Sequence, residues 1–300
     1  MQVKVGIWPY LLVVMLVPAG AWAADESGPD TSTLAEMSLE ELVNVDVTAP
    51  AKLAQPVREA PGVGAAIPRS QIESYGWLSL NDVIFRQPGF APSQDFERLT
   101  VSARGLFESW NNNHLLMLVD GVPFNNTSNG WAYTWDLFPL SLLENVEILR
   151  GPGSALYGTN ATNGVIAVNT RAPSNSVPVE AHARLGNAGT QQYEVVGGHQ
   201  WALASVLLAY SHHRTHGNVY DSYDGSGRTD AAGMLQRFTV NARDYSHYLF
   251  GKVEGQGALR GLSLQVHFHY WSFQTAQGWL FVVPDEAERT IQNREMLWAR

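Results

Sequence analysis

The sequence predicts an α+β domain followed by antiparallel transmembrane β-barrel strands. Short helix and strand patterns are mixed between about residues 60 and 171, and strict apolar–polar alternation begins at residue 179. An apolar stretch at the N-terminus indicates export from the cytoplasm. A soluble sandwich would show the same alternation. Long strands with aromatic residues near their ends, behind an export signal, favour an outer-membrane barrel with a polar lumen.

Residues 1–23 are predicted to be a secretory signal peptide. The apolar stretch from Ile7 to Val17 is shorter than the roughly 20 residues that a membrane-spanning helix requires. Ala21-Trp22-Ala23 then places small residues at the −3 and −1 positions of a cleavage site. The mature chain is therefore expected to begin near Ala24.

Residues 24–59 form a predicted N-terminal leader. Ser38 and Glu41 have the spacing of a capping box, which predicts a short helix ending near Val43. An extended stretch follows before Pro50, and its residues are Val45, Asp46, Val47, Thr48 and Ala49.

Residues 60–171 are predicted to form the α+β domain, a small mixed four-stranded sheet with short helices. Ser79 caps a helix over 80–86, and Pro88-Gly89 ends it. The predicted strands lie within 98–105, 114–123, 145–151 and 164–170. Residues 172–178, rich in proline and serine, are a predicted linker.

Residues 179–300 are predicted to supply the first strands of a barrel. Residues 179–186, 238–243 and 262–271 alternate apolar and polar side chains, which places the two kinds on opposite faces. The stretch 262–271 shows this most clearly, because five apolar residues alternate with Ser263, Gln265, His267 and His269. Those two histidines should point together into the lumen.

The glycine-rich segment 148–171 does not match a nucleotide-binding loop. Gly153 and Gly158 have phosphate-loop spacing, but Thr159 and Asn160 stand where lysine and Ser/Thr belong. The segment is therefore expected to be a sharp turn between strands, where glycine allows close backbone approach.

Composition excludes several function classes. The net charge is −9 without any basic cluster, which argues against nucleic-acid binding, and the absence of cysteine removes thiolate chemistry. No spacing indicates an enzyme or a cofactor site. Histidines at 212, 213, 216, 267 and 269 are predicted to be hydrated polar residues rather than metal ligands, since no third-ligand pattern accompanies them.

Four motifs in order resemble the plug domain of TonB-dependent outer-membrane receptors. They are SLNDVIFRQPGF, VSARG, LLMLVDGVPFN and LLENVEILRGPGSALYGTNATNGVIAVNTR. The resemblance covers residues 38–171 and implies a plug inside a 22-stranded barrel that imports scarce nutrients. Ferric siderophores are the expected substrate class, with cobalamin, haem and carbohydrates left open. Asn163-Gly164 departs from the two glycines common in the family.

The resemblance also implies a partner and site residues. Val45 to Ala49 matches the box that pairs with TonB, the energy-coupling protein of the inner membrane; the alternative is a plain linker. Arg104 and Arg150 match plug arginines that pair with barrel carboxylates. The alternative is that these arginines form ion pairs within the plug, with Glu147 or Asp120.

The resemblance implies that two plug loops face outside and touch substrate. Packing of their aromatic rings on the barrel wall is the alternative interpretation. The candidate substrate-binding residues are Trp110, Asn111, Asn112, Asn113, Asn125, Asn126, Trp131, Tyr133 and Trp135.

The length allows only part of such a barrel. About ten residues per strand plus connections give roughly six to eight strands after residue 175, whereas a plug-containing barrel needs about 22. The chain is therefore expected to be the N-terminal portion of a transporter or the product of a truncated gene. A non-transporting binding or signalling module is the alternative.

Overall fold

The computed structural model divides the chain into two compact units, residues 1–31 and 32–300. The residues that the structure describes all lie in the second unit. They are 46–47, 55–56, 63–94, 99–106, 112–134, 138–173, 177–223, 228–235, 237–274 and 289–300. The predicted signal peptide and the predicted helix at 38–43 lie outside them.

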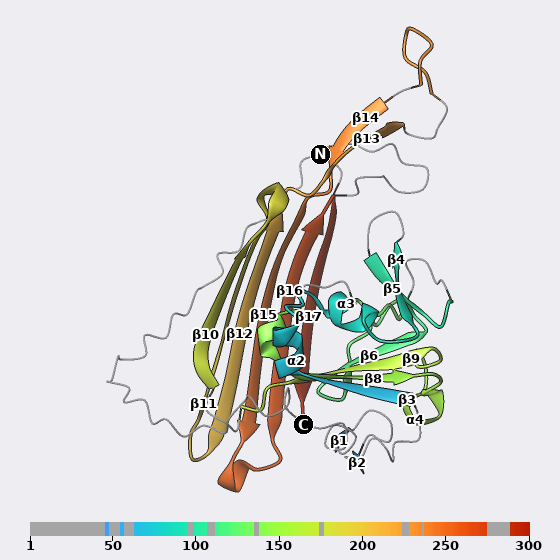
Figure 1. Ribbon diagram of the computed structural model, residues 1–300. Helices are drawn as coiled ribbons and strands as arrows, with labels where there is room; N and C mark the ends of the chain where they lie inside the picture. Colours follow the sequence, from blue (N-terminus) through green and yellow to red (C-terminus); the bar gives the residue numbers. More distant parts are fainter. Residues whose placement is uncertain are drawn as a thin grey trace. The chain divides into compact units, whose positions relative to one another are not determined.

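A mixed five-stranded sheet forms the centre of the α+β domain (Figure 1). Its order is β3-β8-β9-β6-β7, in which β6 and β9 run parallel and the other pairs are antiparallel. The strands span Val63–Pro68 (β3), Leu115–Val119 (β6), Val122–Pro123 (β7), Leu143–Arg150 (β8) and Gly164–Thr170 (β9). All five residues of β6 are buried, as expected for a strand covered on both faces.

Short helices complete this domain. They are α2 (Arg69–Ser74), α3 (Leu80–Phe85) and α4 (Ser154–Tyr157), with a 3₁₀ turn η2 at Leu140–Leu142. The predicted capping box is confirmed, because the Ser79 side chain accepts from the Asp82 N–H and the Asp82 carboxylate accepts from the Ser79 N–H. Helix α3 buries Leu80, Val83 and Ile84 in the hydrophobic core of the domain.

The fold class is as predicted, but strand membership of the sheet differs in two ways. The predicted strand at 98–105 is β5 (Leu99–Ala103), which pairs with β4 (Phe90–Gln94) in a separate ladder. Strands β3 and β7, rather than β5, complete the five-stranded sheet at its two edges. Strand β3 has the sequence VGAAIP, whose small residues carry no alternation signal.

The glycine-rich segment joins β8 to β9, as the sequence indicated, but the connection also contains α4, which the sequence did not predict. Two glycines of this segment lie where neighbouring atoms leave no room for a Cβ atom. A Cβ on Gly164 would lie 2.9 Å from the Leu149 carbonyl oxygen, and one on Gly153 would lie 2.8 Å from Val165 Cγ2. Close approach of chain segments therefore explains both residues.

Six antiparallel strands form one open sheet in chain order (Figure 1). Their order is β10-β11-β12-β15-β16-β17, within the predicted range of six to eight. They span Val177–Leu185 (β10), Gln191–Gln200 (β11), Ala204–Thr215 (β12), Asp244–Gly255 (β15), Ser263–Phe273 (β16) and Thr290–Ala299 (β17). The 3₁₀ turns η3 (Asn187–Gly189) and η4 (Gly257–Leu259) lie in two of the connections.

The predicted strand at 238–243 is not part of this sheet. It is β14 (Arg237–Asn241), which pairs only with β13 (Val219–Tyr223) in a hairpin of its own. The strand itself is confirmed, while its place in the barrel wall is corrected, because the pairing partner is chosen by tertiary structure.

The exposed face of the six-stranded sheet is mostly apolar, whereas its buried face combines polar and charged side chains with aromatic ones such as Phe250 and Trp271. In β16, Gln265, His267 and His269 are buried, whereas Leu264 and Phe268 are 43% and 46% exposed. We call the buried side, which contacts the α+β domain, the inner face, and the opposite side the outer face. Among the described residues, no helix is long and apolar enough to cross a membrane.

Candidate functional site at the inner face of the sheet

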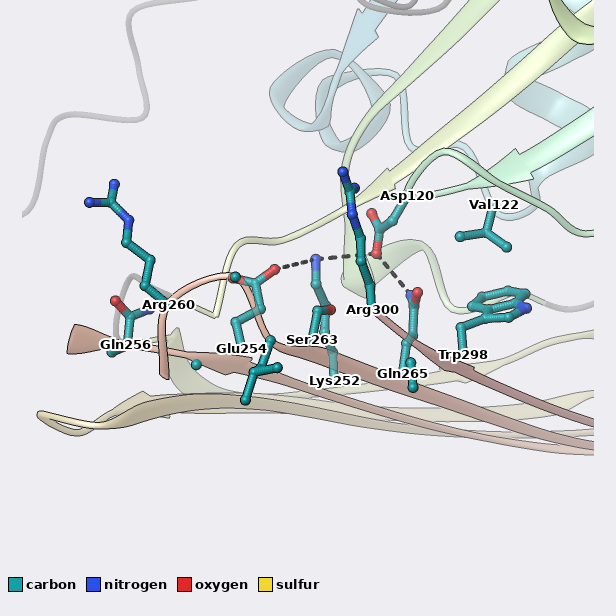
Figure 2. Close-up of a pocket in the computed structure, with 14 residues that line it drawn as sticks. Asp120, Val122, Lys252, Glu254, Gln256, Arg260, Ser263, Gln265, Trp298 and Arg300 are labelled. Atoms are coloured by element: carbon teal, nitrogen blue, oxygen red, sulfur yellow. Dashed lines mark hydrogen bonds and ion pairs between the residues drawn. The ribbon is translucent and has the colours of Figure 1, made fainter. Parts of the chain in front are cut away.

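Lys252 on β15 connects the inner face to the α+β domain (Figure 2). Its Nζ lies 3.2 Å from Asp120 Oδ2 and 3.2 Å from Glu254 Oε1, and it donates to Thr170 Oγ1 at 3.3 Å. The side chain is almost fully buried, so its charge requires these partners. This lysine therefore ties the turn after β6 to the barrel-type sheet.

Asp120 is the centre of this network. It lies in the tight turn between β6 and β7 with φ = 48°, a left-handed conformation that aspartate tolerates. Its carboxylate also accepts from Gln265 Nε2 at 2.8 Å and from the Thr170 N–H and hydroxyl. Several charge-assisted hydrogen bonds thus converge on one carboxylate.

Glu180 on β10 forms a second connection. It accepts from Arg69 on α2 at 2.7 Å and from Arg171 at 2.8 Å, so one carboxylate holds two guanidinium groups. Burial alone would lower the pKa of Arg69, but hydrogen bonds and the charges of Glu73 and Glu180 keep that pKa above its ordinary value. The helix is thereby fixed to the first strand of the sheet.

Glu194 on β11 forms the third connection. Its fully buried carboxylate accepts from the Ser141 N–H at 3.3 Å, from Arg184 at 3.0 Å and from Gln192 at 2.7 Å. A backbone donor of η2 is thereby satisfied from the sheet.

Aromatic rings fill the space between these polar contacts. Phe124 lies 5.2 Å from His267 and 6.1 Å from Trp298 between ring centroids, and Phe138 lies 5.2 Å from Tyr248. The Tyr248 hydroxyl and His267 Nδ1 are 2.5 Å apart. The prediction that His267 and His269 point to the inner side is confirmed, and packing surrounds His267 there.

The other predicted histidine cluster is divided between the two faces. His212 and His213 are consecutive residues of β12, and His216 follows the strand. Among the described residues, no group of three or more His, Cys, Asp or Glu side chains has a geometry that would hold a metal ion.

Some candidate substrate-binding residues have roles within their own loop. The Asn125 amide accepts from the Met117 N–H and donates to the carbonyls of Leu115 and Gly130. Asn126 accepts from the Ser128 and Asn129 N–H groups. Asn125 thus holds the loop against β6, and Asn126 stabilises the turn within the loop.

Aromatic candidates in the same loop pack together. Trp131 and Tyr133 make an edge contact at 6.2 Å, and the Arg294 guanidinium lies 4.1 Å from the centre of the Tyr133 ring. Tyr133 is buried, whereas Trp131 and Asn113 are half-buried. Asn112 is buried and donates to the Ala132 carbonyl at 3.5 Å. Trp110, Asn111 and Trp135 lie outside the described residues.

The two candidate plug arginines lie at different places. Arg104 is exposed with φ = 56°, and Arg150 on β8 donates to the Pro88 carbonyl at 3.3 Å. Within the described part of the chain, Arg150 Nε is buried without a hydrogen-bond partner. Their pairing with barrel carboxylates stays a prediction.

Only the middle of the predicted TonB box is described. Asp46–Val47 form β1, which pairs antiparallel with β2 (Gln55–Pro56). Val45, Thr48 and Ala49 lie outside the described residues.

A pocket of 670 Å³ lies beside the Lys252 network (Figure 2). Its wall combines Asp120 and Val122 of the α+β domain with residues of β15, β16 and β17, including Trp298.

Sequence reasoning missed the three connecting charges on the sheet. Glu180, Glu194 and Lys252 each occupy the polar phase of an alternating strand, and that phase was the available signal. Which acid meets which base depends on strands far apart in sequence, so no local pattern contains it.

The chain is similar to known proteins in part of its length. Residues 56–165 match the family model described as the TonB-dependent receptor plug domain. The vitamin B12 transporter BtuB of Vibrio vulnificus is 38% identical over 122 residues, covering 41% of this chain and 20% of the relative. The chain thus spans about a fifth of the length of this curated relative.

Solved structures agree in fold. The pyoverdine outer membrane receptor FpvA of Pseudomonas aeruginosa superposes with a TM-score of 0.59 at 15% identity, covering 79% of this chain and 32% of FpvA. The ferric enterobactin receptor PfeA of the same species gives 0.52 at 18% identity, covering 77% and 34%. These relatives are receptors and a transporter, not enzymes. Residues 56–165 are therefore a plug domain of the TonB-dependent receptor type, and the strands that follow it have the fold seen in the solved receptors.

Proposed function

We propose that this chain is the N-terminal part of a transporter that imports a metal chelate, a ferric siderophore or cobalamin, across the outer membrane. One observation carries the proposal. A sheet with an exposed apolar outer face binds the plug through charged side chains on its inner face. This is the polarity of a barrel wall around a plug, and the reverse of a sandwich, whose apolar face would be buried.

The outer face supports contact with hydrocarbon. Leu208 at the centre of β12 is 56% exposed, and neighbouring strands add exposed leucine, valine and phenylalanine. Apolar surface on this scale marks a site of association, and here it lies on strands whose polar side chains point the other way.

The connections support an orientation for the sheet. Short connections at 201–203 and 256–262 lie at one end, whereas the connections at 216–243 and 274–289 at the other end are longer. Outer-membrane barrels place short turns toward the periplasm and long loops outside. The turn at 186–190, also at the second end, is short. We therefore assign the Lys252 end to the periplasm.

The names of the relatives support the proposed substrate class. BtuB is named for vitamin B12, a cobalt chelate, and FpvA and PfeA for the siderophores pyoverdine and ferric enterobactin. In our proposal the Trp131 loop, together with Asn113, contacts such a chelate, because aromatic rings and amides suit its flat, polar surface.

Energy reaches this site through TonB. The pairing of β1 with β2 supports the assignment of 45–49 as the TonB box, because a segment that pairs as a strand within its own chain is able to pair with a partner's sheet edge.

The experiment replaces Val47 by proline in the full-length receptor. Proline removes a backbone donor and prevents strand pairing, so uptake of radiolabelled cobalamin or ferric siderophore should fall to background. Binding of the same labelled ligand at the cell surface should stay normal.

Val47→Ala is the matched control, since it keeps the N–H group and should transport normally. Normal uptake by the proline variant would refute the assignment of the box. Absence of binding for every metal chelate in wild-type cells would refute the proposed substrate class.

A further inference from the structure

Arg294 on β17 places a guanidinium group of the sheet against the plug loop that carries Trp131. Its half-buried side chain lies on the inner face, in register with the buried His269 of β16. The guanidinium carbon is 4.1 Å from the centre of the Tyr133 ring and 4.9 Å from the centre of the Phe124 ring. Both distances are within the range of about 6 Å over which an aromatic ring attracts a cation. One arginine of the sheet therefore contacts two rings of the plug.

These two rings lie at the two ends of the Trp131 loop, residues 124–133. Phe124 directly follows β7, is fully buried, and also packs against His267 and Trp298 of the sheet. Tyr133, at the other end of the loop, is 3% exposed. Arg294 therefore connects the end of the loop to a ring that is already fixed at its start.

Hydrogen bonds shape the loop between these two ends. The Asn126 N–H donates to the Trp131 carbonyl, and the Gly130 N–H donates to the Asn126 carbonyl. The Asn126 side-chain amide donates to the Tyr133 hydroxyl at 3.0 Å. The tip of the loop, residues 127–129, is exposed. Trp131 thus stands between an exposed tip and the buried ring of Tyr133.

The contact with Arg294 continues through Tyr133 to Trp131. The rings of Trp131 and Tyr133 have centroids 6.2 Å apart and planes at 79°, which is an edge-to-face arrangement. Such an arrangement favours one relative orientation of the two rings. Trp131 is half-buried, so part of its ring stays open to a ligand. A displacement of Tyr133 would therefore turn the exposed part of Trp131.

Arginine suits the position between the two rings for a chemical reason. The guanidinium group is planar and weakly hydrated, so it stacks on aromatic faces at a low cost of desolvation. The ammonium group of lysine is a compact, strongly hydrated charge, and an uncharged side chain lacks the attraction to the ring faces.

We propose that Arg294 is a positioning residue for substrate binding: from the sheet it holds Tyr133 beside Phe124 and thereby fixes the orientation of Trp131. The inference rests on the proposed function, in which the Trp131 loop contacts a metal chelate. Arg294 then acts on the chelate through Trp131.

The first measurement follows the loop without any ligand, in the purified full-length receptor. This chain contains no cysteine, so a nitroxide on Ser128→Cys, at the exposed tip, reports loop mobility by electron paramagnetic resonance once any cysteine elsewhere in the receptor is replaced. Arg294→Met removes the cation and should raise the mobile fraction of the spectrum by about twofold or more. Tyr133→Leu removes the ring on the other side of the contact and should have the same effect.

The second measurement is equilibrium binding of labelled cobalamin, ferric enterobactin and ferric pyoverdine to whole cells. Arg294→Met should weaken binding of the chelate that wild type binds by about threefold to tenfold. The same substitution should have no further effect in a Trp131→Ala background, because the ring that it positions is gone. A general structural role would instead weaken binding equally in both backgrounds.

Arg260→Met is the matched control, since it removes an exposed arginine from the connection at 256–262 and should change neither the spectrum nor the affinity. Heat-modifiable gel mobility verifies that every variant is folded. An unchanged spectrum in both Arg294→Met and Tyr133→Leu, or an equal loss of affinity with and without Trp131, would overturn the inference. Failure of the proposed function is a different result, because wild-type cells would then bind none of the chelates. In that case the spectrum alone decides whether Arg294 holds the loop.

Discussion

In both sheets of this protein, successive side chains of a strand point to opposite faces, but the two sheets differ in which of those faces are buried. In the plug, β6 and β9 are buried on both faces and consist almost entirely of apolar residues. In the six-stranded sheet, the exposed face is mostly apolar, and the buried face holds charged and polar side chains among aromatic rings. What differs is the surroundings, since the plug sheet lies in a protein core, whereas the other sheet contacts the plug with one face and exposes the opposite face, which we propose to face hydrocarbon.

This comparison shows that burial alone does not identify a core. Glu194 and Lys252 are as buried as many plug leucines, yet they are positioned by ion pairs rather than by apolar packing. Apolar packing therefore dominates within the plug, whereas ion pairs contribute to the contact between the plug and the six-stranded sheet.

The largest expected effect lies in the plug core. Ile166→Ala removes a side chain with no exposure from β9 and should lower the free energy of unfolding by about 2–5 kcal/mol, because it leaves a cavity. Urea unfolding of the purified protein in detergent, followed by tryptophan fluorescence, measures this. Leu156→Ala on exposed α4 is the control and should cost less than about 0.5 kcal/mol. Equal losses of unfolding free energy in the two variants would contradict the assignment of Ile166 to an apolar core.

The next effect tests the outer face. Leu208→Arg places a charge at the centre of the apolar band and should destabilise the membrane-inserted state by about 2–4 kcal/mol. Folding into lipid vesicles, scored by heat-modifiable gel mobility across a urea series, gives the value. Tyr193→Arg, on the outer face near the end of β11 that follows the turn at 186–190, should cost at most about 1 kcal/mol. A larger cost for Tyr193→Arg would mean that the assigned depth is wrong.

A smaller effect tests the polar connection between the two regions. Lys252→Met leaves Asp120 without its cation and should cost about 1.5–3 kcal/mol. In a double-mutant cycle with Asp120→Asn, the two changes should be non-additive by more than about 0.5 kcal/mol. Glu254→Gln, at a more exposed partner of the same lysine, should cost less. Additive costs would show that the lysine and aspartate act independently.

The smallest effect concerns the substrate loop. Trp131→Ala in the full-length receptor should weaken chelate binding by about 1 kcal/mol while membrane assembly stays intact. Equilibrium binding of labelled ligand to whole cells measures the change. Tyr75→Ala, an exposed plug aromatic at the end of α2, should leave the affinity unchanged. Unchanged affinity in Trp131→Ala would assign this ring to packing alone.

Local patterns were sufficient for several elements. The Ser79 capping box, β9 at its predicted bounds and the inward direction of His267 and His269 follow from spacing alone. Helix α4 was missed, because four residues within a glycine-rich segment give no helical period. The candidate site was predicted as loops and arginines, whereas the contacts that hold plug to wall are Glu180, Glu194 and the Asp120–Lys252 pair.

The sequence by itself determined the fold class, the plug motifs and the two faces of each alternating strand, because these depend on residues close together in the chain. Only the tertiary structure decided that β5 leaves the main sheet, that β14 leaves the wall and that Asp120 meets Lys252. Those outcomes depend on which of several compatible strands and charges come together in space. A period-2 pattern gives a strand two faces, but it does not name the neighbour on either edge or the charge that lies across the lumen.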